Sequence, residues 1–306
     1  MPALSVLIPL YGDPPGPSRL REVTAAWLAQ DIPCEVVIAV AGELPVRLAA
    51  DLDQRPGVRV LSAPATTTAP GLLRNLAADH ARAELLHLSD ADVVPLGRDF
   101  LSRGLALAGG RPVAQPWMHR LSDPAGELAG QPVVDYRPAG RDPFCYVTPG
   151  PGRSLQARGD EEIAFSTRVY GSATLPTPKV LPPADARGHA PTPQQEWRAP
   201  YHWGGMLISR RLFESVGGYC PQYFGWGNED DDLLVKAEAR TGVSRGWQID
   251  RSWRCLHFEH PTAHEWTPQR AANAERFADR LALGPDAMIE QDLAVHIAAK
   301  GGASAR

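Results

Sequence analysis

Two aspartates, Asp90 and Asp92, lie just after the apolar segment 84–88, which predicts a buried strand. On an extended chain the side chains at positions i and i+2 point to the same side, so both carboxylates could approach one cation. Hard oxygen ligands favour Mg²⁺ or Mn²⁺, which proteins commonly share with a substrate phosphate. The alternative is a polar turn in which both aspartates accept hydrogen bonds from nearby backbone amides. The position after a strand favours the cation site.

A second acidic segment runs from Asn228 to Asp232, after two glycines that flank Trp226. Asn228 is a suitable N-cap for a helix over 228–241, and acidic residues in a first turn stabilise the helix dipole. That structural explanation accounts for Asp231 and Asp232. It does not account for the glycines, which let a backbone approach a ligand, or for the indole, which offers a flat face to a sugar ring. A carboxylate beside such a platform is a suitable general base for an acceptor hydroxyl.

A third group contains Cys255, His257 and His260, with His264 beyond them. One cysteine and three histidines could form a structural Zn²⁺ site, although no CxxC or HExxH spacing is present. Alternatively, one histidine is a nitrogen ligand of the cation held by the two aspartates, which suits Mn²⁺ better than Ca²⁺. A surface turn with satisfied imidazoles is the third interpretation, and it is favoured for His264.

Strands that alternate with helices must position these residues. Apolar runs predict strands over 4–8, 34–40, 58–61 and 84–88, and helical spacing predicts helices over 18–30, capped by Ser18, and over 71–81. This alternation predicts an α/β fold with a mostly parallel central sheet and helices on both faces. Ligands of such sheets bind beyond the carboxyl ends of the strands, where the two aspartates lie.

The rest of the chain has a different pattern. From about 119 to 200 the periodicity is lost among thirteen prolines, so this stretch is either a surface insertion or a lid over the acceptor. Order returns with a predicted strand over 206–209, helices over 210–216 and 228–241, a strand-like segment over 246–249, and terminal helices near 268–283 and 285–300. We therefore expect two halves, 1–110 and 201–265, with an insertion over 111–200 and C-terminal helices over 266–306.

The composition of the 306 residues, with 43% hydrophobic and 22% charged residues and a net charge of −4, is that of a soluble globular protein. The near-neutral charge disfavours nucleic-acid binding, which needs a basic face. No apolar run approaches the roughly 20 residues of a membrane span, and no charged leader precedes the first predicted strand. Four separated cysteines fit a reduced cytoplasm, and scarce lysine beside abundant Ala, Gly and Pro suggests a bacterial source. Peripheral membrane association through the terminal helices stays open.

Several ordered motifs together resemble the GT-A-fold glycosyltransferases. Those similar to the family-2 type are Ser5–Tyr11 (SVLIPLY), Gly71–Asn75 (GLLRN) and Leu88–Asp92 (LSDAD). Those similar to the β-1,4-galactosyltransferase type of C-terminal half-domain are His202–Ser209 (HWGGMLIS), Gly217–Tyr219 (GGY) and Gly225–Asp232 (GWGNEDDD). The resemblance covers residues 1 to about 110 and 200 to 265. It implies metal-dependent transfer of a sugar from a nucleotide-diphosphate donor to an acceptor hydroxyl.

The resemblance also implies a role for each matching residue. Pro9, Leu10 and Tyr11 would line the nucleoside base, Arg74 would lie near the nucleotide or its phosphates, and Asp90 would face the ribose or the metal ion. Asp92 would bind the metal ion, with His257 or His260 as a later ligand. Asp230 would be the base of an inverting displacement, Glu229 would hold a sugar, and Trp226, Asn228 and Trp203 would bind the acceptor. The implied cofactors are Mn²⁺, favoured over Mg²⁺, and a UDP-, GDP- or dTDP-sugar.

Two departures from the family patterns concern specificity. The acidic pair that usually follows the second strand is replaced by Val40-Ala41-Gly42-Glu43, so Glu43 or Asp13 would have to contact the base, and the preference for uridine is open. The galactosyltransferase pattern has glycine where Asn228 stands, which changes the acceptor pocket. We expect the acceptor to be a glycan, a lipid-linked sugar, or a secondary metabolite or peptide natural product.

Two other functions are alternatives to this one. A sugar nucleotidyltransferase would need a glycine-rich phosphate loop with Lys or Arg after the first strand, whereas segment 11–17 is rich in proline and lacks lysine. A non-catalytic nucleotide- or carbohydrate-binding protein with this fold is expected to lose the metal-binding or base carboxylates, yet Asp90, Asp92 and Asp230 are all present.

Overall fold

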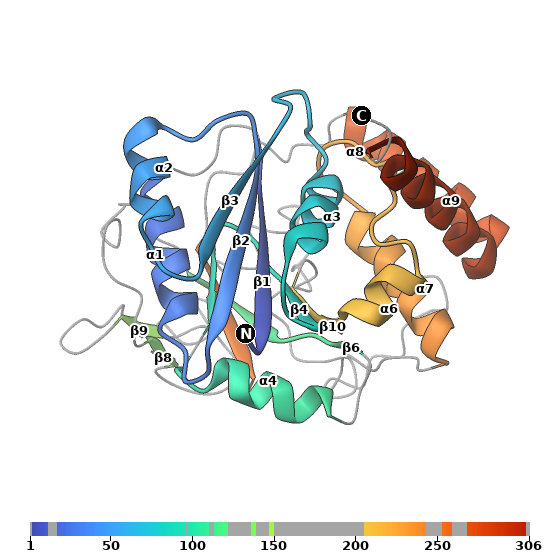
Figure 1. The fold of residues 1–306 in the computed structure, drawn as a ribbon. Helices are drawn as coiled ribbons and strands as arrows, with labels where there is room; N and C mark the ends of the chain where they lie inside the picture. The colour runs from blue at the N-terminus through green and yellow to red at the C-terminus, as the bar shows by residue number, and fades with distance from the viewer. Residues whose placement is uncertain are drawn as a thin grey trace, which may run out of the picture.

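A six-stranded sheet with helices on both faces forms the centre of the protein (Figure 1). The structure is a computed structural model. It describes residues 2–11, 17–95, 97–109, 113–121, 136–138, 147–149, 205–242, 253–258 and 268–303. The architecture confirms the predicted α/β fold.

The first half alternates strands and helices as predicted, with two helices that the sequence pattern did not indicate, α2 and α4. Its elements are β1 (Leu4–Leu10), α1 (Pro17–Leu28), β2 (Cys34–Ala41), α2 (Val46–Asp53), β3 (Val58–Ala63), α3 (Pro70–His80), β4 (Leu85–Leu88), β5 (Val93–Pro95) and α4 (Phe100–Ala108). The short strands β6 (Val113–Ala114), β7 (Trp117–Leu121), β8 (Tyr136–Pro138) and β9 (Val147–Pro149) follow. The second half contains β10 (Met206–Ser209), α6 (Arg210–Ser215), α7 (Glu229–Thr241), β11 (Arg254–Phe258), α8 (Pro268–Leu283) and α9 (Pro285–Ala303).

The sheet has the strand order β3-β2-β1-β4-β10-β6 and is mixed. Strands β1 to β4 pair in parallel, while β10 runs antiparallel to β4 and to β6. Alternate residues of β1 enter different cores: Leu4, Val6 and Ile8 pack with α1 and α2, whereas Leu7 packs with α3 and α7. Because both faces are covered, the strand is apolar along its whole length, as expected for buried parallel strands.

Two predicted boundaries were wrong. The first strand does not stop at Pro9 but continues to Leu10. It pairs with β4 only at residues 5–7, so the missing N–H of Pro9 lies where β1 has a single neighbour, β2. Helix α1 begins at Pro17, and Ser18 is therefore inside the helix rather than its N-cap. Proline is favoured in the first helical turn because that turn leaves N–H groups unpaired in any case.

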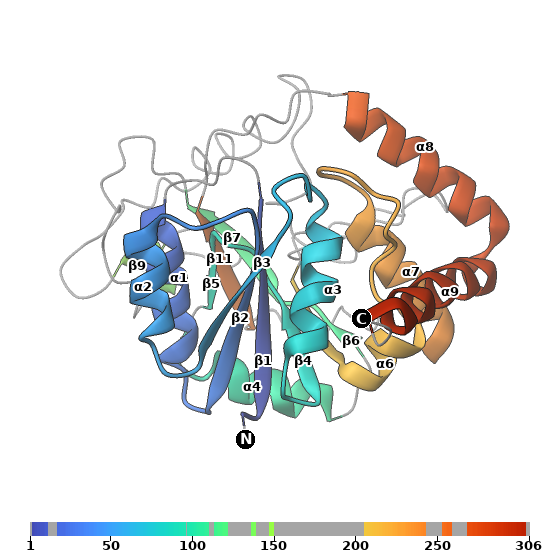
Figure 2. The same ribbon diagram turned by 45° about the horizontal axis from the view of Figure 1, so that its top comes forward.

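A second, three-stranded sheet has the order β5-β11-β7. Strand β11 pairs antiparallel with β5, placing His257 opposite Val93. The C-terminal helices α8 and α9 pack against α7, on the side of the molecule away from α1 and α2 (Figure 2). Both terminal helices were predicted with nearly their observed bounds. No helix among the described residues is long and apolar enough to cross a membrane.

Several predictions fall outside the described residues. They concern the strand-like segment 246–249, the loop 12–16, and the interpretation of 119–200 as a lid or an insertion, apart from the short strands β7, β8 and β9. Trp203, His260, His264 and Asp13 also lie outside the described residues.

Candidate active site

The carboxyl ends of β1 and β4 form one edge of the candidate site. Ser89 and Asp90 directly follow β4, and the N–H of Ser89 donates to the carbonyl of Leu7 in β1 at 2.9 Å. The chain then turns, and the N–H of Val93 donates to the carbonyl of Asp90 at 3.3 Å. Asp90 and Asp92 are therefore in a turn and not on the extended chain that their spacing suggested. Each carboxylate consequently meets a different partner.

Asp92 lies beside His257, which β11 brings from a distant part of the chain. The Nε2 atom of His257 is 3.3 Å from Oδ2 of Asp92. The antiparallel register explains the contact, because His257 stands opposite Val93, the residue after Asp92. The structure thus places His257 next to the Asp92 carboxylate. Cys255, two residues earlier on β11, is buried in the hydrophobic core instead.

Arg74 connects Asp90 to Asp230. Its side chain is 2% exposed, and its Nη1 atom lies 3.2 Å from Oδ1 of Asp230. Nη2 donates to Oδ1 of Asp90 and to the carbonyl of Ser89. Both terminal nitrogens of the buried guanidinium thus have carboxylate partners, and charge-assisted hydrogen bonds of this kind are strong. Arg74 therefore fixes the two carboxylates relative to each other.

Tyr219 is a second partner of Asp230, and its place in the sequence indicated no such role. Its hydroxyl donates to Oδ1 of Asp230 at 2.9 Å. The backbone of Tyr219 is held by Asn75: the N–H of Tyr219 donates to Oδ1 and Nδ2 donates to its carbonyl, both at 2.9 Å. The close approach requires Gly71, because a Cβ there would lie 2.9 Å from the Cβ of Tyr219. The motif Gly71–Asn75 thus positions Tyr219, which in turn donates a hydrogen bond to Asp230, the expected base.

The loop before α7 explains the glycines that flank Trp226. Gly227 has a φ of 121° and Asn228 a φ of 65°, both in the region that favours glycine. Asn228 occupies the N-cap position without a capping hydrogen bond, and its Nδ2 donates to Asp231 at 3.4 Å. The predicted capping by Asn228 was therefore wrong. Its backbone conformation explains why glycine stands at this position in the galactosyltransferase pattern, since only glycine and asparagine adopt it readily.

Glu229 and Asp230 begin α7 with perturbed carboxyl groups. Glu229 is 3% exposed and accepts a hydrogen bond from the N–H of Gly227 at 2.9 Å. Burial, followed by the charge of Asp230, raises the pKa of Glu229 to about 8. Burial also raises the pKa of Asp230, and the charge of Asp90 adds to this effect while Arg74 opposes it. Two adjacent carboxyl groups with raised pKa values are typical of sites for acid–base chemistry.

Tyr11 directly follows β1 and lies near the carboxylates of the site. Burial raises the pKa of its hydroxyl, and the charges of Glu229, Asp90 and Asp230 contribute in the same direction. Tyr11 therefore lies within electrostatic range of all three carboxylates. Leu10, which was predicted to line the base as well, is instead 7% exposed and packs in the hydrophobic core. Glu43 is exposed, just beyond the carboxyl end of β2.

Asp232 has a different role from the one its position suggested. A place in the first turn of a helix suggested interaction with the helix dipole, but the side chain is fully buried and accepts hydrogen bonds from Arg280 of α8, at 2.6 and 3.3 Å. Lys236 and Asp292 complete a buried cluster of two cations and two anions: Lys236 lies 3.3 Å from Asp232 and 2.5 Å from Asp292, and Arg280 lies 2.7 Å from Asp292. This cluster joins α7, α8 and α9.

The donor atoms around Asp92 fit a divalent metal ion. Among the described residues, no group of three or more His, Cys, Asp or Glu side chains is placed to hold a metal ion. A Mg²⁺ or Mn²⁺ ion shared with a diphosphate needs few protein ligands, since phosphate oxygens and water supply the others. The Asp92 carboxylate and the His257 imidazole, 3.3 Å apart, are a suitable pair, and a nitrogen ligand suits Mn²⁺ better than Ca²⁺.

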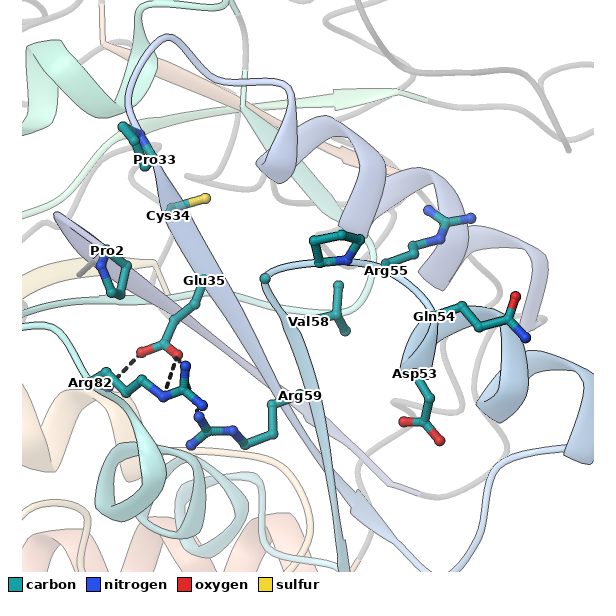
Figure 3. Close-up of a pocket in the computed structure, with 12 residues that line it drawn as sticks. Pro2, Pro33, Cys34, Glu35, Asp53, Gln54, Arg55, Val58, Arg59 and Arg82 are labelled. Carbon is teal, nitrogen blue, oxygen red and sulfur yellow. Dashed lines mark hydrogen bonds and ion pairs between the residues drawn. The ribbon is translucent and has the colours of Figure 1, made fainter.

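A groove at the opposite end of the sheet is not part of this site. It is lined by residues at the amino ends of β2 and β3, with Arg59 and Arg82 beside Glu35 (Figure 3). The buried Glu35 carboxylate lies 3.9 Å from each of these arginines and accepts a hydrogen bond from Ser5 at 2.6 Å. Ligands of parallel sheets bind at the carboxyl ends of the strands, so we do not assign the donor to this groove.

Part of the chain is similar in sequence to galactosyltransferases. The family model for the N-terminal domain of galactosyltransferase matches residues 189–261, which include Trp226, Asp230 and His257. Human beta-1,4-galactosyltransferase 1 is 31% identical over 97 residues, which are 30% of this chain and 22% of the human protein. Human beta-1,4-galactosyltransferase 4 is 44% identical over 46 residues, covering 15% of this chain and 13% of the relative. The chain thus matches about a fifth or less of these relatives.

Similar solved structures cover nearly the whole chain. The crystal structure of GalNAc-T7 with UDP, GalNAc and Mn²⁺ has a TM-score of 0.56 at 17% identity, covering 91% of this chain and 48% of that one. The structure of S. aureus TarS 1-349 in complex with UDP-GlcNAc has a TM-score of 0.53 at 14% identity, covering 96% of this chain and 71% of that one. At these identities the likeness establishes the fold. The chain therefore has the GT-A glycosyltransferase fold, and residues 189–261 are similar to a domain of galactosyltransferase.

Proposed function

We propose that the protein is a metal-dependent glycosyltransferase that moves a sugar from a nucleotide-diphosphate donor to an acceptor hydroxyl. The observation that carries this proposal is that Asp92 and His257 lie within electrostatic range of Asp90, which Arg74 in turn links to Asp230, beyond the carboxyl end of β4. A metal site and a base within one small region are what such a transfer needs. The relatives named above support the reaction class.

The donor diphosphate is assigned to the side of the site formed by Asp90, Asp92 and His257. A divalent cation bound by Asp92 and His257 would neutralise the charge of the leaving diphosphate. Tyr11 is assigned to contact the nucleoside, because it directly follows β1 and lies within electrostatic range of Asp90. UDP is the favoured nucleotide because the two similar structures contain UDP or a UDP-sugar, with GDP and dTDP as alternatives.

Asp230 is assigned as the base for the acceptor. The acceptor oxygen attacks the anomeric carbon while the bond from that carbon to the diphosphate oxygen breaks, and the acceptor proton passes to the Asp230 carboxylate. A single displacement inverts the anomeric configuration. The hydrogen bond from Tyr219 and the ion pair with Arg74 orient this carboxylate. A raised pKa makes it a stronger base than an exposed aspartate.

Trp226 and Glu229 are assigned to the acceptor side. Trp226 is half-buried on the loop before α7, and Glu229 follows it at the start of the helix. An indole beside a carboxylate suits a sugar ring, which presents an apolar face and a rim of hydroxyls. We therefore propose an acceptor with such a ring, either a glycan or a glycosylated metabolite or peptide.

The test is Asp230→Asn, which keeps the shape of the side chain and removes the base. We expect the variant to bind UDP with Mn²⁺ as the wild type does and to lose transfer by about 10²- to 10⁴-fold. Transfer is measured with UDP-galactose, UDP-N-acetylglucosamine and UDP-N-acetylgalactosamine against a panel of free monosaccharides. Wild-type turnover in the variant would show that Asp230 is not the base.

A further inference from the structure

Helix α8 holds the loop that carries Trp226, through a single buried side chain. Asn273 is 1% exposed, and its Nδ2 donates to the carbonyl of Phe224 at 2.8 Å and to that of Trp226 at 3.4 Å. Its Oδ1 accepts from the N–H of Phe224 at 3.4 Å and from Arg276 at 3.1 Å. One asparagine thus satisfies three backbone groups of a loop that belongs to neither a helix nor a strand.

The neighbours of Asn273 on α8 reinforce this contact. The guanidinium of Arg270 lies 4.7 Å from the ring centroid of Trp226, and that of Arg276 lies 5.9 Å from the ring centroid of Tyr223. Residues three or four positions apart share a helix face, so Arg270, Asn273 and Arg276 all face the segment from Tyr223 to Trp226. The Arg270 guanidinium lies over one face of the Trp226 indole, and this cation–π contact stabilises the position of the ring.

Further along α8, Arg280 joins this helix to α7, the helix that carries Asp230. Arg280 lies seven residues, or about two turns, after Asn273. It binds Asp232 of α7 and Asp292 of α9. Helix α8 contacts both α7 and α9, and Figure 2 shows its end next to α9, so the buried charges join the three helices. Because α8 is anchored at Arg280, Asn273 holds the Trp226 loop at a fixed position relative to Asp230.

We infer that α8 is part of the acceptor site, with Asn273 as a positioning residue for the Trp226 loop and Arg270 as a residue that fixes the indole. The acceptor part of this inference rests on the proposed function, whereas the hold on the loop does not. The matched family segment ends at residue 261, so α8 lies outside it. The contribution of α8 is therefore a feature of this chain that the galactosyltransferase-type segment alone does not supply.

The variant that tests the hold is Asn273→Asp. The aspartate keeps the size of the side chain and the acceptor for Arg276, but it replaces Nδ2 by an oxygen that faces two carbonyls. The control is Glu275→Gln, a polar change on the exposed side of α8. Hydrogen–deuterium exchange of the free protein is followed in peptides that contain residues 222–228 and, as an internal reference, residues 85–95. We expect about tenfold faster exchange over 222–228 in the Asn273→Asp protein alone.

The acceptor role is tested by steady-state transfer with the donor and monosaccharide panel described above. For Asn273→Asp we expect the acceptor KM to rise about five- to tenfold, with the donor KM and the stabilisation by UDP and Mn²⁺ unchanged. Arg270→Ala leaves the backbone hydrogen bonds intact and serves as a second variant if Asn273→Asp does not fold. It is expected to raise the acceptor KM without altering donor binding.

The outcomes separate this inference from the proposed function. Wild-type exchange over 222–228 and a wild-type acceptor KM in Asn273→Asp would overturn the inference. An equal rise of donor and acceptor KM would also overturn it, because it would indicate a general disturbance of the site. If the wild-type protein transfers no sugar, that result counts against the proposed function alone. The exchange experiment would then still show whether Asn273 of α8 holds the loop.

Discussion

Arg74 and Asp230 form an ion pair across 156 residues of sequence, with Nη1 of Arg74 3.2 Å from Oδ1 of Asp230. The other terminal nitrogen of the same guanidinium binds Asp90. One buried cation therefore connects the acidic turn after β4 to the acidic first turn of α7. This connection fixes the turn after β4 and the start of α7 relative to each other.

Replacing Arg74 should move the pH dependence of transfer. Arg74 lowers the pKa of Asp230, which burial and Asp90 raise. A lysine cannot bridge two carboxylates in the way a guanidinium does. Because Asp230 must be ionised to accept a proton, Arg74→Lys moves the acidic limb of the kcat profile to higher pH. If the pKa of Asp230 rises by about one pH unit, turnover on the acidic limb falls about tenfold and recovers at alkaline pH. An unchanged profile with a uniformly lower kcat would contradict this role.

The groups that face Asp230 are few among the described residues. They are Arg74, Tyr219, Tyr11, Asp90 and the adjacent Glu229. Tyr219→Phe is therefore a useful comparison, since it removes one hydrogen bond and leaves the ion pair. We expect the acidic limb to move in the same direction but less far, measured in the same pH series, because Tyr219 also stabilises the ionised carboxylate and so lowers the pKa of Asp230.

Asp92 and His257 should each be needed for metal-dependent nucleotide binding. Asp92→Asn and His257→Gln preserve the size of the side chains and weaken their ability to bind a cation. We expect both variants to melt near the wild-type temperature without ligand and to lose the stabilisation by UDP with Mn²⁺. Differential scanning fluorimetry measures both quantities. Normal stabilisation in either variant would remove that residue from the metal site.

Arg280 should contribute strongly to stability through its buried partners. Arg280→Met leaves Asp232 and Asp292 with Lys236 as their remaining cation in the described cluster. Breaking a buried pair from one side costs about 3–5 kcal/mol. Urea denaturation followed by circular dichroism measures this loss. Arg103→Met is the matched control, because Arg103 forms a surface pair with Asp99 at 3.7 Å, and it should change stability by less than about 1 kcal/mol.

Glu229 should make stability depend on pH. Its pKa is raised from 4.5 to about 8, so between these values the folded protein keeps a proton that the unfolded chain releases. Stability therefore falls as the pH rises through this window, by at most about 1.4 kcal/mol per pH unit. Glu229→Gln lacks this dependence and should gain stability over the wild type between pH 5 and pH 8. A constant difference between the two proteins across this range would contradict the raised pKa.

The sequence predicts much of the first half of the fold because its signals are local. Apolar runs mark β1, β2, β3 and β4, and helical spacing marks α1 and α3. The extent of β1 beyond Pro9 depends on which neighbours the strand has, which no local pattern contains. Helices α2 and α4 are short, at eight and nine residues, so they offer few periods from which to recognise them.

The candidate site was predictable in its residue types but not in its connections. The apolar run before Asp90 and Asp92 correctly indicated a strand that ends just before them, whereas their spacing wrongly suggested an extended chain, because a turn gives each a different partner. The sequence shows that Asp232 lies in the first turn of a helix, but it does not show that the side chain is buried against a cation. Its partner, Arg280, is 48 residues further along the chain, so only the folded structure reveals the ion pair. The contact of Asp92 with His257 depends on the register of β11 against β5, which follows from tertiary packing.

The most direct test of the central claim is the thermal stability of the wild-type protein with UDP, GDP and dTDP, each in the presence of Mn²⁺ and of EDTA. A ligand that binds the folded state raises its stability, by about 2.7 kcal/mol at 100 times the dissociation constant. A metal-dependent nucleotide-sugar transferase predicts a higher melting temperature with one of these nucleotides in Mn²⁺ and the loss of that increase in EDTA. An unchanged melting temperature with all three in Mn²⁺ would contradict the assignment of Asp92 and His257, and with it the proposed function.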